Sequence, residues 1–210
     1  MSLVSPCRRL SLAVAAVAVT AAVTVTASPA MASDPAAGCP AAATSNPFAA
    51  WGDVADYQLA PGGDIEDGAS SWSLTGGAGA VEGSETFAVA GSSDHLSLRL
   101  PGVSSATTAR MCIDAARPSL RFFAKRLGGS DRGNLLVEVV YDNAAGNEFV
   151  ATAGSISATE DWAPSASLPT VVSALAAAQG GGIQASIRFT PQGGGIWSVD
   201  DVYVDPVRRP

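Results

Sequence analysis

The chain has 210 residues, enough for one ordinary domain and a short appendage but too few for two comfortable domains. It carries 19 Asp and Glu against 12 Lys and Arg, a formal net charge of -7, and this acidity argues against nucleic acid or an anionic membrane surface as partner. The single histidine excludes sites that need two imidazoles, and 22 Gly with 13 Pro are typical of a turn-rich β protein.

Residues 1–32 have the pattern of a secretory signal peptide. Arg8 and Arg9 precede an uncharged apolar run over residues 10–26, and small residues occupy the cleavage positions that end at Ala32. We expect cleavage after Ala32 and a secreted, extracellular protein that has no membrane contact afterwards. The alternative is an uncleaved membrane anchor, for which the apolar run is short.

The mature chain would keep two cysteines, Cys39 and Cys112. An even pair in an exported protein predicts a disulfide, which would join a flexible arm at residues 33–47 to the middle of the domain. Two free thiols, or lipidation of Cys39, are the alternatives. Neither cysteine belongs to a CxxC pair, so no redox or metal role is predicted for them.

Short strands separated by turn residues are predicted over residues 48–206, followed by a tail at 207–210. Alternation is clear where the leucines of His95–Leu100 share one face of the segment. The predicted strands are Val54–Leu59, Trp72–Leu74, Glu85–Ala90, His95–Leu100, Thr107–Asp114, Ser119–Leu127, Leu135–Tyr141, Ile183–Phe189 and Ile196–Val204. Only Pro169–Gln179 could form a helix. About nine short strands predict an all-β fold, a two-sheet antiparallel β-sandwich, although their spacing does not distinguish a jelly roll from other sandwich topologies.

Two segments at the ends of this domain carry a family likeness. The stretch from Pro61 to Gly68, followed by Trp72 and a small-residue segment at 79–83, opens the domain, and the run over residues 196–206 closes it. The first resembles the opening of galactose-binding-like β-jelly-roll modules of the carbohydrate-binding type, with Ile65 where such modules often have Phe. The second resembles their last strand, and the chain is also similar to small secreted actinobacterial proteins. The resemblance implies a jelly-roll sandwich.

The same resemblance implies a structural calcium ion, which in that fold often lies where an early Glu faces a late Asp. Carried over to this chain, the ligands would be Glu66 with Asp200 or Asp201, helped by backbone carbonyls near Asp64 and Gly83. Calcium takes six to eight hard oxygen ligands, and acids on paired strands can supply them. Strand alternation places Asp200 and Asp201 on opposite faces, so both would point inward only with a bulge. The alternative is that these acids lie in turns and at the surface.

Candidate carbohydrate-binding residues are aromatic side chains that could stack on sugar rings, with polar neighbours for the hydroxyl groups. We name Trp162, Tyr57, Tyr141 and Arg188 as this set, while the alternative is that large aromatic residues fill the core. No catalytic residue is predicted, and the Gly-x-Ser-x-Gly elbow of serine hydrolases does not occur.

The sequence therefore predicts a secreted, non-catalytic, monomeric β-sandwich module that is stabilised by calcium and binds a polysaccharide or cell-wall glycan. One alternative is a structural or protein-interaction domain of the cell envelope. Another is a small polysaccharide hydrolase or lyase, because two acids at a suitable separation are sufficient for glycoside hydrolysis.

Overall fold

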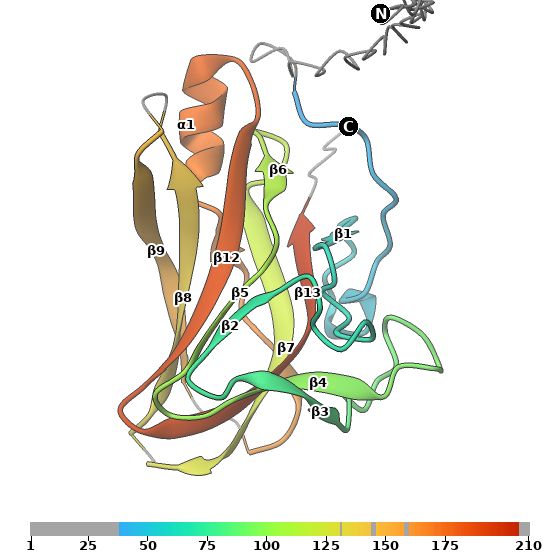
Figure 1. Ribbon diagram of the computed structural model, residues 1–210. Coiled ribbons are helices and arrows are strands. Elements are labelled where there is room, and N and C mark those ends of the chain that lie inside the picture. The colour runs from blue at the N-terminus through green and yellow to red at the C-terminus, as the bar shows by residue number, and fades with distance from the viewer. Residues whose placement is uncertain (1–37, 131, 144–145, 158–159, 206–210) are drawn as a thin grey trace, which may run out of the picture. The chain divides into compact units, whose positions relative to one another are not determined.

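The computed structural model describes residues 38–205 except 131, 144–145 and 158–159, so the predicted signal peptide and C-terminal tail lie outside the described residues. The described chain forms two antiparallel β-sheets that pack face to face, which confirms the predicted all-β sandwich (Figure 1). In the part of the chain that is described, no helix is long and apolar enough to cross a membrane.

The first sheet has seven strands, in the order β10-β7-β13-β4-β3, with β1 paired to β13 and β11 paired to β7. Its strands are β1 (Gln58–Leu59), β3 (Gly79–Glu82), β4 (Leu96–Leu100), β7 (Ser119–Gly129), β10 (Ala163–Pro164), β11 (Leu168–Pro169) and β13 (Gly195–Asp205). The first strand of the domain, β1, is therefore paired with the last, β13.

The second sheet has six strands, in the order β2-β5-β12-β8-β9, with β6 paired to β12. Its strands are β2 (Ser73–Thr75), β5 (Ser105–Thr107), β6 (Met111–Ile113), β8 (Asn134–Asp142), β9 (Glu148–Ser157) and β12 (Ile183–Gln192). A short 3-10 helix, η1 (Ala49–Trp51), precedes the first sheet, and helix α1 (Val172–Gln179) lies at one end of the second.

The main core lies between the two sheets and follows the period-2 pattern of their strands. In β12 the residues Ile183, Ala185, Ile187 and Phe189 are buried in this core, as their alternation predicted. The intervening residues of β12 consequently point to the outer face of the six-stranded sheet, where Arg188 lies.

A second, smaller apolar cluster covers the opposite face of the seven-stranded sheet. We call it the outer apolar cluster; it consists of Phe48, Tyr57, Phe123, Trp162 and Tyr203. The segment before β1 contributes to it, and Ser45 is bridged to Tyr57 by two backbone hydrogen bonds of 2.8 and 2.9 Å. The seven-stranded sheet is therefore covered on both faces, and in β13 every residue except Ile196 is buried.

The predicted disulfide between Cys39 and Cys112 is present. The described part of the predicted flexible arm, from residue 38 onward, is bonded to the domain at further points. The Cys39 N–H donates to Asp114 Oδ2 at 2.8 Å, and Arg117 Nη2 donates to the Pro40 carbonyl at 2.8 Å. The arm is thus attached through one covalent bond and several polar contacts.

Three element predictions were wrong in detail. Glu85–Ala90 is a loop rather than a strand, and the strand that pairs with β4 is β3 instead. The predicted strand at 107–114 is divided into β5 and β6. Strand β9 was not predicted at all, because its Ala, Thr, Gly and Ser residues give little apolar alternation.

Candidate functional site

A β-bulge in the last strand brings two consecutive acids into the protein interior. The register between β13 and β7 shifts between Asp200 and Tyr203, and Asp201 has a positive φ of 50°. The N–H and carbonyl of Val202 are bonded to the turn at residues 60–63 at this point. Asp200 and Asp201 are consequently both fully buried, which simple strand alternation would not allow.

Two further acids meet Asp201 from the connection between β3 and β4. Carboxylate oxygens of Glu85, Asp94 and Asp201 all lie within 4.8 Å of one another, and we call these three residues the cation cluster. Both carboxylate oxygens of Asp94 and both of Asp201 are buried and accept no hydrogen bond from any described residue. Buried carboxylates without donors are costly unless a cation compensates them.

Burial and mutual repulsion disturb the protonation of these acids. Burial, followed by a hydrogen bond that protonated Asp94 donates to Glu66 and by the charge of Glu66, raises the pKa of Asp94 to about 7. Burial, followed by the charges of Asp94, Glu85, Asp64 and Glu66, raises the pKa of Asp201 to about 8. Asp200 is raised to a pKa of about 9 by burial and by Asp201, although it accepts backbone hydrogen bonds from Glu85 and Asp201 of 2.9 Å each. Each shift means that the cation-free site resists ionisation at neutral pH.

The five residues predicted as metal ligands differ in their distance from this cluster and in the hydrogen bonds that they already form. Asp201 is a member, and Asp200 lies beside it. Glu66 Oε1 accepts the N–H groups of His95 and Leu96 at 2.8 and 2.7 Å, and Oε2 pairs with His95 Nδ1 at 2.6 Å. Both oxygens of Glu66 thus already have partners.

The charge of Asp64 contributes to the raised pKa of Asp201. The Gly83 carbonyl accepts a hydrogen bond of 2.6 Å from the Ser97 hydroxyl. The sequence reasoning missed Glu85 and Asp94. Both lie in the connection between two adjacent strands, so their convergence on β13 follows from the topology and from no local pattern.

The cluster contains only oxygen ligands, which suits a hard divalent cation. Calcium accepts carboxylate ligands in flexible arrangements, whereas zinc prefers nitrogen and sulfur. Glu85, Asp94 and Asp201 are the residues that could hold such an ion, with Asp200 adding negative charge nearby.

A separate feature is a row of polar side chains across the outer face of the six-stranded sheet. The strand registers place Ser73 beside Thr107, Thr107 beside Arg188, Arg188 beside Glu138, and Glu138 beside Thr152. We call these five residues the polar row. Because neighbouring strands lie about 4.8 Å apart, the row extends for about 19 Å perpendicular to the strands.

Three members of the polar row, Ser73, Thr107 and Arg188, line a groove of about 540 Å³, together with Ser186 and Glu148. Arg188 has only loose ion pairs there, at 3.9 Å to Glu138 and 3.7 Å to Glu148. No described residue forms a closer hydrogen bond with its guanidinium group. Its planar set of donors can therefore still bind the oxygens of a ligand.

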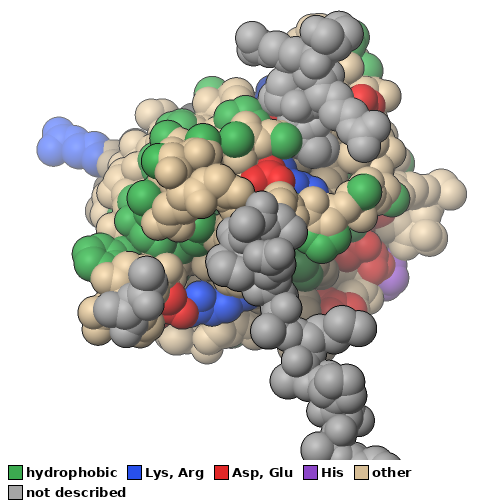
Figure 2. Space-filling view, turned by 90° about the horizontal axis from the view of Figure 1, so that it is seen from above, with side chains coloured by type: hydrophobic (Ala, Val, Ile, Leu, Met, Phe, Trp, Pro, Cys, Tyr) green, Lys and Arg blue, Asp and Glu red, His purple; other side chains and the backbone are tan. Residues whose placement is uncertain are grey.

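At the end of the six-stranded sheet near α1, with an aromatic wall on the face of the sheet that turns toward the core, lies a cleft of about 620 Å³. Tyr141 and Phe149 stack with their ring centroids 5.9 Å apart, and Phe149 is 46% exposed. Arg110 lines both the groove and the cleft, and it pairs with Asp142 at 2.8 Å. Figure 2 shows hydrophobic side chains gathered at the end of the molecule seen from above.

The four predicted ligand-binding residues therefore divide into two groups. Arg188 lies in the groove and Tyr141 in the cleft near α1. Tyr57 and Trp162 are only 2% and 7% exposed and belong to the outer apolar cluster, where Lys125 Nζ lies 4.7 Å from the centre of the Trp162 ring. Neither of these two buried rings has a face open to a sugar.

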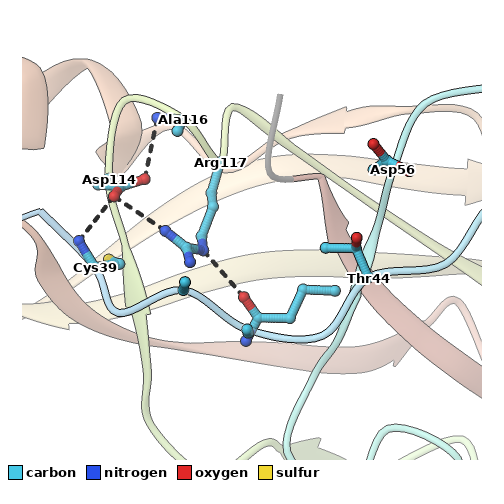
Figure 3. Close-up of a pocket in the computed structure, with 9 residues that line it drawn as sticks. Cys39, Thr44, Asp56, Asp114, Ala116 and Arg117 are labelled. Carbon is cyan, nitrogen blue, oxygen red and sulfur yellow. Dashed lines mark hydrogen bonds and ion pairs between the residues drawn. The ribbon is translucent and has the colours of Figure 1, made fainter. Parts of the chain in front are cut away.

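A third cavity, of about 350 Å³, lies between the arm and the loop that precedes β7. Figure 3 shows Arg117 directed toward Asp114 in this pocket. Arg117 pairs with Asp114 at 3.0 Å and donates to Gln58 and to the Pro40 carbonyl. Each nitrogen of the Arg117 guanidinium group therefore already has a partner, and these contacts attach the arm to the domain. Arg117 consequently has little capacity to bind a ligand.

Comparison with known proteins identifies similar folds. No protein-family model matches the chain, and no curated protein sequence matches it. The CBM22-1 xylan-binding domain from Paenibacillus barcinonensis is 11% identical, over 74% of this chain and 97% of that chain, with a TM-score of 0.47. The family 11 carbohydrate-binding module of a cellulosomal cellulase from Clostridium thermocellum is 12% identical, over 72% of this chain and 95% of that one, with a TM-score of 0.43.

The enzymatically active domain of tailspike protein 4 from bacteriophage CBA120 is 15% identical, with a TM-score of 0.49. The match covers 71% of this chain but only 21% of the tailspike chain. The β-sandwich that the chain ends indicated is confirmed by the two antiparallel sheets of this chain. Since a fold alone does not define a ligand, the binding function depends on the side chains described above.

Proposed function

We propose that this protein is a secreted, non-catalytic β-sandwich module that binds a glycan across the outer face of its six-stranded sheet. The observation that carries this proposal is the polar row. Its hydroxyl, guanidinium and carboxylate groups form an unbroken line across five strands. Sugars present alternating hydroxyl donors and acceptors, and such a line offers both kinds of partner along an extended chain.

Arg188 is the central group of the row. Because its contacts with Glu138 and Glu148 are long, a sugar hydroxyl could receive its hydrogen bonds without breaking a short ion pair. The two carboxylates can in turn accept hydrogen bonds from hydroxyl groups.

The proposal includes calcium bound by Glu85, Asp94 and Asp201 as a structural ion. Its support is the set of buried carboxylate oxygens on Asp94 and Asp201 that no described donor satisfies. The ion would neutralise the repulsion between acids from β13 and from the β3–β4 connection, and would join these segments. The secreted location rests on residues 1–32, and a monomeric state remains our expectation.

The test of glycan binding is calorimetric titration and affinity electrophoresis with soluble xylan, β-1,4-galactan and mixed-linkage glucan. Arg188→Ala should weaken binding of the recognised polysaccharide at least about tenfold, since a hydrogen bond from a charged group contributes about 1.5–3 kcal/mol. Arg99→Ala, which changes a half-buried arginine of the seven-stranded sheet, is the control and should bind like the parent.

Binding that is equal in Arg188→Ala and the parent would remove the groove from consideration, and no binding to any polysaccharide would overturn the proposed function. The pair Glu138 and Glu148 beside Arg188 also provides the acids that a small glycoside hydrolase would need. Release of reducing ends from the bound polysaccharide, abolished by Glu138→Gln, would replace the non-catalytic assignment with that activity.

A further inference from the structure

Glu85 connects the cation cluster to a loop with an exposed aromatic tip. Its carboxylate accepts the N–H of Val89 at 2.8 Å and the N–H of Phe87. Its own N–H donates to Asp200 at 2.9 Å. One buried side chain thus takes part in the cation cluster and also fixes the backbone two and four residues further along the chain.

The loop between β3 and β4 is held at both of its ends by this cluster. Glu85 lies at its start and Asp94 at its end, and both carboxylates converge on Asp201 of β13. Between them, Ala88 has a positive φ of 54°, a conformation that L-residues other than glycine rarely adopt. Such a conformation costs free energy and persists only where surrounding contacts impose it, and here the hydrogen bonds to Glu85 enclose it on both sides.

The tip of the loop contacts the segment before β1 through aromatic rings. Phe87 packs edge-on against Trp51, with centroids 4.8 Å apart and an angle of 84°, and the two side chains are 44% and 37% exposed. Both rings also contact Phe123 of the outer apolar cluster, at 5.7 and 5.3 Å. The loop therefore covers part of an apolar cluster that would otherwise be open to solvent.

These contacts make the position of the loop depend on what the cation cluster binds. Oxygens of Glu85, Asp94 and Asp201 lie within 4.8 Å of one another, and no described donor bonds the Asp201 carboxylate to either end of the loop. A divalent cation that binds all three carboxylates would join both ends of the loop to β13.

We propose that a divalent cation at the cation cluster acts as a clasp, which holds the β3–β4 loop closed and sets Phe87 against Trp51. The inference rests on the cation site of the proposed function and adds a consequence of it. In the cation-bound protein the aromatic pair is formed and Phe123 is covered. In the cation-free protein the loop opens, Phe87 leaves Trp51, and the outer apolar cluster becomes exposed on this side.

The experiment follows the loop directly by amide exchange in two-dimensional NMR of the mature chain, with calcium or with EDTA. The amides of Phe87 and Val89 donate to Glu85, so their exchange should become at least about tenfold faster in EDTA, the change expected when a local opening becomes frequent. Acrylamide quenching gives a second readout, because Trp51 is the most exposed of the four tryptophans. Its quenching should increase in EDTA.

Three variants separate the steps. Glu85→Gln should lose the calcium effect on both the amides and Trp51. A third measurement is the midpoint of thermal unfolding, which bound calcium should raise. Phe87→Ala should keep this rise, because the substitution leaves the cation cluster intact. It should lose the change in Trp51 quenching, because it removes the aromatic contact. Glu82→Gln, at an exposed acid on the neighbouring strand, should respond like the parent.

The outcomes distinguish this inference from the cation site itself. A calcium-dependent rise in midpoint with unchanged exchange at Phe87 and Val89 and unchanged Trp51 quenching would overturn the clasp and leave the ion as a structural one. No effect of calcium on the midpoint would overturn both.

Discussion

Replacing Asp201 with Asn tests the cation cluster most sharply, because the expected change in stability has opposite signs with and without calcium. Asp201 is fully buried, and burial with the charges of Asp94, Glu85, Asp64 and Glu66 raises its pKa to about 8. The usual pKa of the carboxyl group is 3.8. Between these two values the folded, cation-free protein retains a proton that the unfolded chain has released.

The sign of the pH dependence follows from this difference in bound protons. A carboxyl group whose pKa is raised by folding does not reduce the unfolding free energy below about pH 4, where it is protonated in both states. The unfolding free energy then falls as the pH rises toward the folded pKa. Each unit of pKa difference corresponds to about 1.36 kcal/mol, so a difference of about four units sets an upper limit on the order of 5 kcal/mol for Asp201. That is comparable with the whole unfolding free energy of many domains, about 5–15 kcal/mol.

Asp201→Asn keeps the size of the side chain and removes the charge. In EDTA at pH 8 the variant should therefore unfold at a higher denaturant concentration than the parent, and at pH 5 the difference in unfolding free energy should fall to about a third, on the order of 2 kcal/mol. With calcium at about 10⁵ times its dissociation constant the parent gains about 6.8 kcal/mol, more than the penalty of about 5 kcal/mol, so the order of the two unfolding midpoints should reverse at pH 8. The measurement is urea unfolding followed by tryptophan fluorescence at both pH values.

Asp161→Asn serves as the control, since it removes an exposed acid. Its urea midpoints at pH 5 and pH 8, each with calcium and with EDTA, should be nearly those of the parent. If Asp201→Asn destabilised the protein equally in calcium and in EDTA, the carboxylate would have a conventional structural role. Buried repulsion and cation binding would then both be the wrong description of the cluster.

Three further predictions concern the attachment of the arm and the backbone, and the third includes a second glycine substitution for comparison. Arg117→Met should lower the unfolding free energy by about 2 kcal/mol in urea, because the half-buried carboxylate of Asp114 loses its charged hydrogen-bond donor. Reduction of the Cys39–Cys112 bond, which spans 73 residues, should cost about 4 kcal/mol in the same assay run with and without reductant. Gly129→Ala should prevent folding, because its φ is 85° and a Cβ atom would lie 2.2 Å from a backbone oxygen, as judged by soluble yield and circular dichroism. Gly180→Ala has a similar φ of 71° but open space around it, so it should cost only about 1–2 kcal/mol.

The parts of the fold that follow local periodicity were predictable from sequence. The alternation in His95–Leu100 and Ile183–Phe189 identified both segments as strands and identified which side chains enter the core. The prediction failed at Glu85–Ala90, where the residues favour a strand by type. There the Glu85 carboxylate binds the N–H groups of Phe87 and Val89, which are then unavailable to a neighbouring strand.

The candidate cation site was only partly predictable, for a physical reason. Asp201 could be named because it lies in the last strand, whose pattern resembles that of known modules. Glu85 and Asp94 contribute through the pairing of β3 with β4 and of β4 with β13, which places the connection between them beside the bulge. The approach of Glu85 and Asp94 to Asp201 depends on strand pairing between distant segments, so no short sequence pattern could indicate it.

The location of the proposed glycan surface depends on which sheet face is covered. Tyr57 and Trp162 were reasonable candidates from sequence, but the segment before β1 joins them to the outer apolar cluster on the seven-stranded sheet. That coverage leaves their rings without an open face. The polar row and the groove around Arg188 instead lie on the outer face of the six-stranded sheet, where the side chains alternate with those of the core. A glycan that binds along an extended sheet surface therefore has its best site at Arg188, and substitutions there should change binding with less effect on stability than those in the outer apolar cluster.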